Sequence, residues 1–146
     1  MKTCTFFGHR NAPLESHPAV AVKLIELISK HGVDRFYVGA QGDFDHYTVN
    51  ALIEVKMLFP HIDINIVLPK IPDTLPKWGP AEYTIVPEGI ENAPPRFAID
   101  KCNRWMLEKS DYVIGYVTRR FGGAAKYLRE AEKKGKTVIN LANNND

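Results

Sequence analysis

Residues 4–13 read CTFFGHRNAP, a run of strand-forming residues that stops at a glycine followed by a histidine and an arginine. Aromatic and β-branched side chains favour strands, and glycine lets the chain turn. We therefore predict a strand over residues 3–7 that carries Gly8, His9 and Arg10 into a loop at its carboxyl end. The arrangement of the remaining chain decides what this loop faces.

Short β-rich runs alternate along the chain with longer segments of helical periodicity. The predicted strands cover residues 3–7, 35–38, 62–68, 112–117 and 137–141, and the predicted helices cover residues 18–31, 44–59, 96–109 and 122–134. Such alternation is typical of α/β proteins with a parallel sheet. The sequence therefore predicts an α/β fold with a mostly parallel, open sheet of about five to six strands flanked by helices.

The composition indicates one globular unit. The 146 residues are 45% hydrophobic and 25% charged, and we expect a single domain over residues 1–146. A proline-rich excursion at about residues 69–95 carries at most one short strand, near residues 83–86, because proline cannot donate to a sheet. The net charge of +2 gives little support to nucleic-acid binding. With no membrane span or signal peptide indicated, we expect a cytoplasmic protein.

Three loops carry unusual chemistry to the carboxyl ends of the predicted strands, at residues 8–10, 39–45 and 119–123. In an open parallel sheet, ligands bind outside these ends. Glycine lets backbone N–H groups approach an anion, and the following helix adds its positive end. Arg10, Arg119 and Arg120 add charges that fork onto phosphate oxygens. The loops therefore predict a site for phosphate or a nucleotide, with no metal and no cofactor.

Polar side chains in two of these loops admit two interpretations each. His9 is a candidate hydrogen-bond donor or acid–base group, and Asp43 or Asp45 is a candidate acceptor for a ribose hydroxyl or a base edge. Equally, Asp43 suits the N-cap of the following helix, and Gly39 and Gly42 suit a tight turn. The loop lacks the GxGxxG dinucleotide fingerprint, and the chain has no GxxxxGK[ST] phosphate loop.

The order of several segments resembles a known superfamily over nearly the whole chain. These segments read TCTFFGHR, YVGAQGDFD, PEGIENAPPR, NRWMLEKSDYVIGYV and GGAAKYLREAEKKGKTVINL. They resemble standalone SLOG-type proteins of the Smf/DprA–LOG superfamily. The resemblance implies a Rossmann-like three-layer fold, a small nucleotide-derived ligand and, because relatives commonly pair, a possible homo-oligomer.

The resemblance also implies which positions bind the ligand. They are Gly8, His9 and Arg10 in the first motif, Gly39, Gly42 and Asp45 in the second, Asn103, and Gly122, Gly123 and Ala124 in the third, beside Arg119. Cys102 stands where the superfamily is expected to have an arginine, so one cationic contact is missing. The PGGxGTxxE signature of LOG phosphoribohydrolases is absent, and the corresponding turn reads FGGAAKYLRE.

Three functions are compatible with these features. The first is a sensor or sequestering protein that binds an ADP-ribose-like species or a nucleoside phosphate. The second is a nucleotide N-glycosidic-bond hydrolase or transferase, with His9, Asp43 and Asp45 as catalytic candidates. The third is a DNA-associated role by analogy with DNA-processing relatives, which the nearly balanced charge makes the weakest. The sequence leaves open whether the protein is an enzyme.

Overall fold

The computed structural model describes residues 1–71 and 80–143, and it contains one sheet of six parallel strands in the order β4-β3-β2-β1-β5-β6. The strands are β1 (Lys2–Gly8), β2 (Val33–Val38), β3 (Asp63–Val67), β4 (Thr84–Ile85), β5 (Tyr112–Tyr116) and β6 (Thr137–Asn140). This arrangement confirms the predicted α/β fold with a parallel open sheet.

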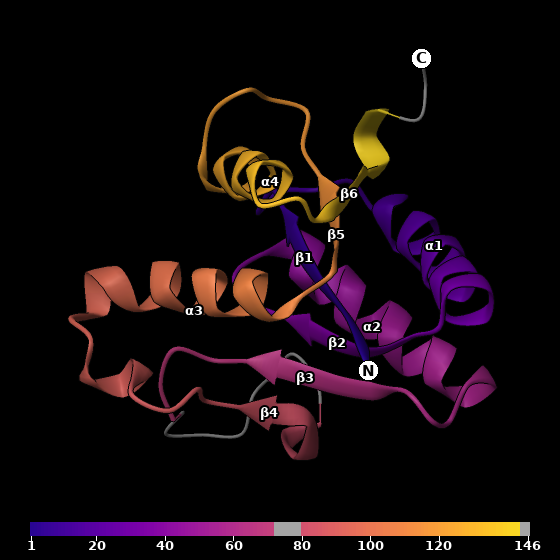
Figure 1. Cartoon of the computed structure of the whole chain (residues 1–146), viewed down its shortest axis with the longest axis horizontal. Coiled ribbons are helices and arrows are strands. Elements are labelled where there is room, and N and C mark those ends of the chain that lie inside the picture. The colour runs from indigo at the N-terminus through magenta and orange to yellow at the C-terminus, as the bar shows by residue number, and fades with distance from the viewer. Residues whose placement is uncertain (72–79, 144–146) are drawn as a thin grey trace.

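Helices cover both faces of the sheet, which gives the three layers of a Rossmann-like fold. They are α1 (Ser16–His31), α2 (Asp43–Leu58), α3 (Pro95–Lys109) and α4 (Gly123–Lys133). Figure 1 shows α1 and α2 on one side of the strands and α3 and α4 on the other. Residues of the first pair pack into one hydrophobic cluster and those of the second pair into another.

The strands feed both clusters because successive side chains point to opposite faces of a sheet. In β1, Phe6 packs toward α1 and α2, whereas Phe7 packs toward α3 and α4. Phe36 and Tyr37 of β2 divide in the same way. Near-continuous apolar strands are therefore what a sheet covered on both faces requires.

The element boundaries differ from the predictions by a few residues. Helix α1 begins at Ser16, two positions before the predicted start at Pro18. Proline is tolerated in the first turn of a helix, where its missing N–H is not needed, so it does not mark the start here. The described parts of the proline-rich excursion hold two single-turn 3₁₀ helices and the predicted short strand, β4. Residues 72–79 of this excursion lie outside the described residues.

The chain changes direction across the sheet at β1, which has β2 on one side and β5 on the other. Chain connections leave opposite sides of the sheet at such a point, which opens a crevice beyond the strand ends. The topology thus places the loop at Gly8 next to the loop that follows β5. Among the described residues, no helix combines the length and apolar character needed to cross a membrane.

Candidate functional site

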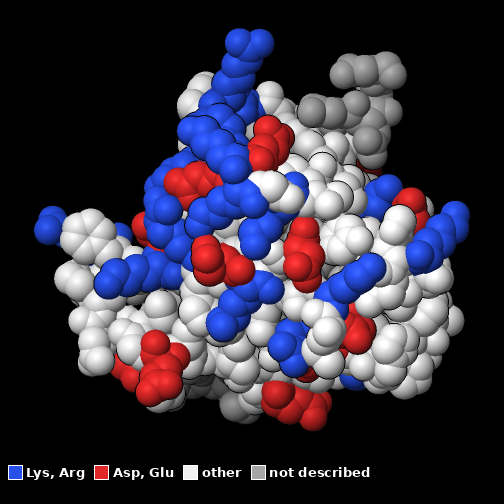
Figure 2. All heavy atoms as spheres, in the orientation of Figure 1, with Lys and Arg blue, Asp and Glu red and all other residues white. Residues whose placement is uncertain are grey.

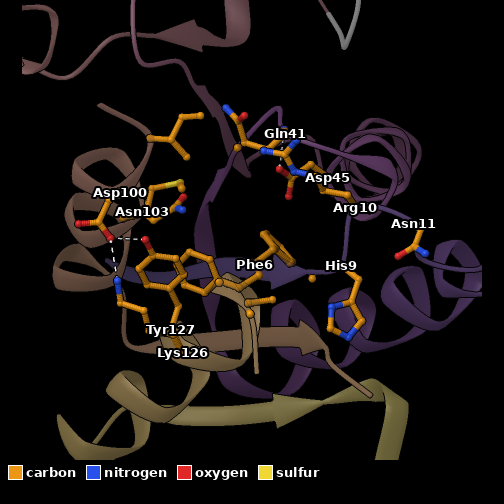
Figure 3. Close-up of a pocket in the computed structure, with 18 of the residues that line it drawn as sticks. Phe6, His9, Arg10, Asn11, Gln41, Asp45, Asp100, Asn103, Lys126 and Tyr127 are labelled. Carbon is orange, nitrogen blue, oxygen red and sulfur yellow. Dashed lines mark hydrogen bonds and ion pairs between the residues drawn. The ribbon is translucent and has the colours of Figure 1, made fainter. Parts of the chain in front are cut away.

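A cavity of about 710 Å³ lies beyond the carboxyl ends of β1 and β2, walled by α3 and the start of α4. Figure 3 shows Arg10, Gln41 and Asp45 at one end of it and Asp100, Asn103 and Tyr127 at the other. The lining residues are Phe6, Phe7, Gly8, His9, Arg10, Asn11, Gly39, Gln41, Asp45, Arg96, Phe97, Ile99, Asp100, Asn103, Met106, Arg119, Gly122, Gly123, Ala124, Lys126 and Tyr127. The three predicted loops therefore meet at one cavity.

Close backbone contacts join the loop after β1 to the start of α2. The backbone N–H of Asp43 donates a hydrogen bond of 2.7 Å to the carbonyl of Arg10. A methyl group at Gly42 would lie 2.5 Å from the Arg10 Cα, so only glycine fits there without a shift of the chain. Gly8 is also sterically required, because its methyl would lie 2.3 Å from Phe44 Cγ. These contacts fix the position from which Arg10 extends.

Asp45 is the carboxylate at this end of the cavity. Its Oδ2 accepts a hydrogen bond of 2.9 Å from the backbone N–H of Gln41. Burial raises the pKa of Asp45 to about 6, against the opposing effects of that hydrogen bond and of the Arg10 charge. Gly39 leaves just enough space, since a methyl group there would lie 3.1 Å from the same oxygen.

His9 joins the loop after β1 to the loop after β5. Its Nε2 accepts a hydrogen bond of 2.9 Å from the backbone N–H of Thr118, and its Nδ1 lies 3.1 Å from Arg119 Nη2. Burial and the Arg119 charge both lower the pKa of His9. Because Nε2 accepts from Thr118, an uncharged ring carries its hydrogen on Nδ1, toward Arg119, and a second hydrogen on Nε2 would face the Thr118 donor. His9 thus connects two loops, and both ring nitrogens already have neighbours.

The third loop supplies the left-handed turn that starts α4. Gly122 has φ of +98°, a conformation that disfavours other residues, and Gly123 is the first residue of the helix. Arg119 lies over the ring of Phe121, with its guanidinium carbon 5.7 Å from the ring centroid. The N-terminus of α4 therefore faces the cavity beside Arg119, and a helix N-terminus favours anions.

A hydrogen-bonded network that the sequence reasoning missed forms the other end of the cavity. Asp100 of α3 accepts a hydrogen bond from the Tyr127 hydroxyl and one of 3.3 Å from Lys126 Nζ, both on α4. Asn103 also lines the cavity, and its amide acts to lower the pKa of Tyr127. The Tyr127 ring stacks on Phe7 at 5.0 Å between centroids. The network ties two walls of the cavity together.

The network also fixes the charge of Asp100. The Tyr127 hydrogen bond is the largest of the effects that lower the pKa of Asp100 to about 2, followed by contacts with Arg104 and Lys126. Burial and the bond to Asp100 raise the pKa of Tyr127 to about 12. Arg104 continues the network outward to Glu130 through hydrogen bonds of 3.1 and 3.2 Å. Asp100 is therefore a carboxylate at any physiological pH.

The cavity carries an excess of positive charge. Its four basic side chains, Arg10, Arg96, Arg119 and Lys126, face two carboxylates, Asp45 and Asp100. Within the described residues, the three arginines form no salt bridge of 4 Å or less, whereas Lys126 is paired with Asp100. Anions are therefore favoured at the cavity, most strongly where these arginines lie.

Most of the predicted ligand-binding residues line the cavity. They are Gly8, His9, Arg10, Gly39, Asp45, Asn103, Arg119, Gly122 and Gly123. Gly42 is not a lining residue; it packs against the backbone of Arg10 instead. Arg120 is also outside the lining, and its carbonyl accepts a hydrogen bond from Arg129. Whether these residues bind a ligand stays a prediction.

Two sequence-based expectations need correction. Asp43 and Asp45 do not face the same cavity: Asp43 is exposed and absent from the lining. Positions two apart in a helix point about 200° apart, so only one of the two can face inward. Asp43 is not the N-cap either, because Gly42 occupies that position.

Cys102 does not replace the cationic contact expected at its position. It is buried in the cluster between the sheet and the helices α3 and α4, and burial raises its pKa to about 11. Arg96 extends from the first turn of α3 into the lining of the same cavity. The described residues contain no group of three or more His, Cys, Asp or Glu side chains arranged to hold a metal ion.

The missed residues carry a recognisable signal. On α3, the lining positions Arg96, Ile99, Asp100, Asn103 and Met106 follow the three- and four-residue spacing of one helical face. Asn103 marked this face from the sequence, so its neighbours one turn away were candidates too. Nothing in the sequence indicated which residues of α4 lie opposite, because that depends on how α3 and α4 pack.

Comparison with known proteins shows the fold and no closer relationship. No family model matches the chain, and no curated protein sequence is significantly similar to it. Among solved structures, the chain is similar to the X-ray structure of DNA processing protein A (DprA) from Streptococcus pneumoniae. The TM-score is 0.67 at 13% sequence identity, over 94% of this chain and 49% of that chain. The likeness is one of fold. The chain spans about half the length of that protein.

Proposed function

We propose that this protein binds a nucleotide or a nucleotide-derived metabolite, such as a nucleoside phosphate or an ADP-ribose-like species, and acts as a sensor or sequestering protein. The observation that carries the proposal is the cavity at the carboxyl ends of the strands, with Arg10, Arg96 and Arg119 outside any salt bridge within the described residues. The superfamily resemblance of the sequence implies the same ligand class, and the DprA-like fold agrees with that superfamily.

The dimensions of the cavity suit such a ligand. Small-molecule sites in proteins typically have volumes of about 300–1,000 Å³, and this cavity has about 710 Å³. Guanidinium groups bind phosphate through paired hydrogen bonds, and the N-terminus of α4 adds backbone N–H donors. Arg119 contacts the His9 imidazole rather than a carboxylate, so turning it toward a phosphate breaks no ion pair with an acidic residue.

Thermal unfolding in the presence of candidate ligands tests the proposal. The panel contains ADP-ribose, cyclic ADP-ribose and nucleoside monophosphates. A ligand at 100 times its Kd adds about 2.7 kcal/mol to the free energy of unfolding, which raises the Tm by several degrees. Arg10→Ala and Arg119→Ala should remove the shift. Lys101→Ala is the matched control, because Lys101 is exposed on α3 and does not line the cavity.

A panel in which no member raises the Tm would contradict the proposal. Equal shifts for the wild type and the two arginine variants would show that the ligand binds outside this cavity. Either result argues against the site, and the Lys101→Ala control separates a loss of net charge from a loss of local contacts.

A second candidate function is hydrolysis of the N-glycosidic bond of a nucleotide. The observation that favours it is Asp45, a cavity carboxyl whose pKa is raised by burial to about 6. In this reaction water adds to the ribose carbon and the base leaves with a proton. Incubation with nucleoside monophosphates and NAD, followed by chromatography, should then release free base or nicotinamide. Asp45→Asn should abolish this release, and an unchanged substrate panel would leave binding alone.

A DNA-associated role is the third candidate, because the similar structure is named a DNA processing protein. Figure 2 shows acidic side chains interspersed among the basic ones over α3 and α4. Ion pairs such as Arg104–Glu130 and Lys134–Glu108 account for part of this pattern. Such a surface gives DNA phosphates few uncompensated charges. A salt-sensitive mobility shift of single-stranded DNA would favour this role over the first two.

A further inference from the structure

We propose that the α3 wall of the cavity is the subsite for the nucleobase, with Arg96 and Phe97 stacking on the base and Asn103 reading its edge. The subsite selects a base that presents an amino group beside an acceptor nitrogen, as adenine does. This inference rests on the proposed nucleotide-binding function and specifies the orientation of the ligand within the cavity.

The stacking surface is an exposed aromatic ring that lines the cavity. The Phe97 side chain is 46% exposed, which is unusual for a large apolar residue at the wall of a cavity. The Arg96 guanidinium lies over its ring, 4.7 Å from the centroid. A planar guanidinium and an aromatic ring are the two protein surfaces on which nucleobases stack. A stacked base covers the apolar area that Phe97 leaves in water.

A second exposed aromatic provides a comparison. Phe121 retains 70% of its exposed area and also lies beneath an arginine, Arg119. Phe121 does not line the cavity, whereas Phe97 does. The two residues therefore share chemistry and differ in position: Phe97 faces the cavity, whereas Phe121 packs under Arg119 outside it.

Asn103 lines the cavity, and its amide acts on the Tyr127 hydroxyl. The hydroxyl donates its proton to the Asp100 carboxylate. Its oxygen therefore faces the Asn103 amide as an acceptor, which favours an amide with its N–H side toward Tyr127. An amide has two N–H hydrogens and one oxygen. The amide oxygen and one hydrogen remain for the ligand.

These two remaining groups complement one type of base edge. An asparagine amide pairs with an amino group and an adjacent acceptor nitrogen, as it does with the N6 and N7 atoms of adenine. Hypoxanthine and guanine carry an oxygen in place of that amino group, so the amide oxygen would face another acceptor. Asn103 is therefore a specificity-determining residue, and Tyr127 and Asp100 are positioning residues that act through it.

The opposite end of the cavity remains for the phosphate. Figure 3 shows Arg10 across the cavity from Asn103, with Phe6 between the two ends. Arg119 and the diglycine at the start of α4 also line the cavity. Lys126 is already paired with Asp100, so the charges of these two neighbours of Asn103 offset each other, which suits an uncharged base. A mononucleotide thus lies with its base on α3 and its phosphate toward Arg10 and Arg119.

Calorimetric titration with AMP, IMP and GMP tests this inference on the full chain. The wild type should bind AMP about tenfold more tightly than IMP or GMP, the usual discrimination of one good paired contact. Phe97→Ala should weaken AMP binding about tenfold, in line with the loss of a stacked aromatic, and Met57→Ala, at an exposed apolar side chain of α2 that does not line the cavity, should leave it unchanged. Tyr127→Phe, which keeps the ring on Phe7, should bring the Kd values for AMP and IMP together.

Asn103→Ala gives the same test without altering Tyr127, and the thermal melt of each variant confirms that it is folded. Equal affinity of the wild type for AMP and IMP overturns the assigned role of Asn103. AMP binding that Phe97→Ala and Met57→Ala change equally overturns the stacking site. In both cases nucleotides still bind and the proposed function stands. A wild type that binds no nucleotide overturns the inference together with the proposed function.

Discussion

The two carboxylates that line the cavity have opposite environments. Asp45 has few donors around it, and burial raises its pKa to about 6. Asp100 accepts hydrogen bonds from Tyr127, Lys126 and Arg104, which together lower its pKa to about 2. The same side chain is thus close to neutral at one end of the cavity in mildly acidic solution and fully charged at the other. Burial and the number of donors together decide the charge, because burial disfavours the ionised form and each donor stabilises it.

The two ends of the cavity are also built by different means. The Asp45 end depends on backbone approach, with Gly42 against the chain at Arg10. The Asp100 end depends on side chains that reach between α3 and α4. Where two backbone segments touch, an added side-chain atom has no room. In a side-chain network, by contrast, a lost partner can be replaced by water. Substitutions at the two ends should therefore lower the free energy of unfolding by different amounts.

Gly42→Ala should have the largest effect of these substitutions. The new methyl group would lie 2.5 Å from the Arg10 Cα, so the chain must shift. We expect the free energy of unfolding in urea to fall by about 3 kcal/mol, the upper range for overpacking. Gly123→Ala is the control, because its methyl would meet only Tyr127 Cε2 at 3.9 Å. A change below about 1 kcal/mol is expected there. Equal losses would show that the two ends are equally constrained.

The pH dependence of stability should separate the two carboxyl groups. The pKa of Asp45 is raised from 3.8 to about 6, so the folded state binds its proton more tightly than the unfolded state does. Its contribution to stability is therefore present below pH 4 and is lost as the pH rises to about 6. The loss should amount to roughly 2–3 kcal/mol.

Urea unfolding of the wild type and Asp45→Asn between pH 4 and pH 7 measures this effect. The difference in unfolding free energy between the two proteins should shift in favour of the variant as the pH rises, and it should be constant above about pH 7. A difference that does not vary with pH would mean that Asp45 titrates normally in the folded protein.

Asp100→Asn should cost less than the glycine substitution. The amide keeps an acceptor oxygen but loses the charge that attracts Lys126 and Arg104. Because Asp100 is 37% exposed, water screens these pairs, and we expect a loss of about 1 kcal/mol at pH 7. Asp63→Asn breaks an isolated exposed pair with Arg35 and should cost less than about 0.5 kcal/mol. If Asp100→Asn is no less stable than Asp63→Asn, the hydrogen-bonded network around Asp100 does not stabilise the fold.

Tyr127→Phe should give the smallest change, seen in the pKa of Asp100. The Tyr127 hydroxyl is the first cause of the lowered value, so without it the pKa should rise by about one unit toward 3.8. Carbon-detected NMR titration of the carboxyl groups measures the shift. Asp45 is the internal control, because Tyr127 is not among the causes of its shift. An Asp100 value that stays near 2 would assign the effect to Arg104 and Lys126.

Most of the fold was predictable because it depends on local patterns. The alternation of apolar strands with amphipathic helices predicted the six strands and four α-helices to within a few residues but none of the short 3₁₀ helices, and the parallel topology follows from that alternation. The first turn of α1 was the main error, since proline was taken as the start of a helix that admits it at the third position. The residues that line the cavity were predictable where glycine and charge occur together in one loop, as at Gly8, His9 and Arg10.

The pair Asp43 and Asp45 shows where such prediction ends. Sequence patterns do not distinguish the two carboxylates. Only the rotation of α2 against the sheet directs Asp45 into the cavity and leaves Asp43 in water. Asp100 and Tyr127 are 27 positions apart, on different helices. No local pattern connects them, because their contact depends on the packing of α3 on α4.

The sequence by itself determined the strands, the helices and the three loops at one edge of the sheet, because backbone preference and hydrophobic periodicity act over neighbouring residues. The tertiary structure alone decided which side chains share the cavity, which carboxyl group is charged and what lowers the pKa of His9. Those properties depend on burial and on hydrogen-bond partners from distant segments, and these exist only once the helices have packed on the sheet.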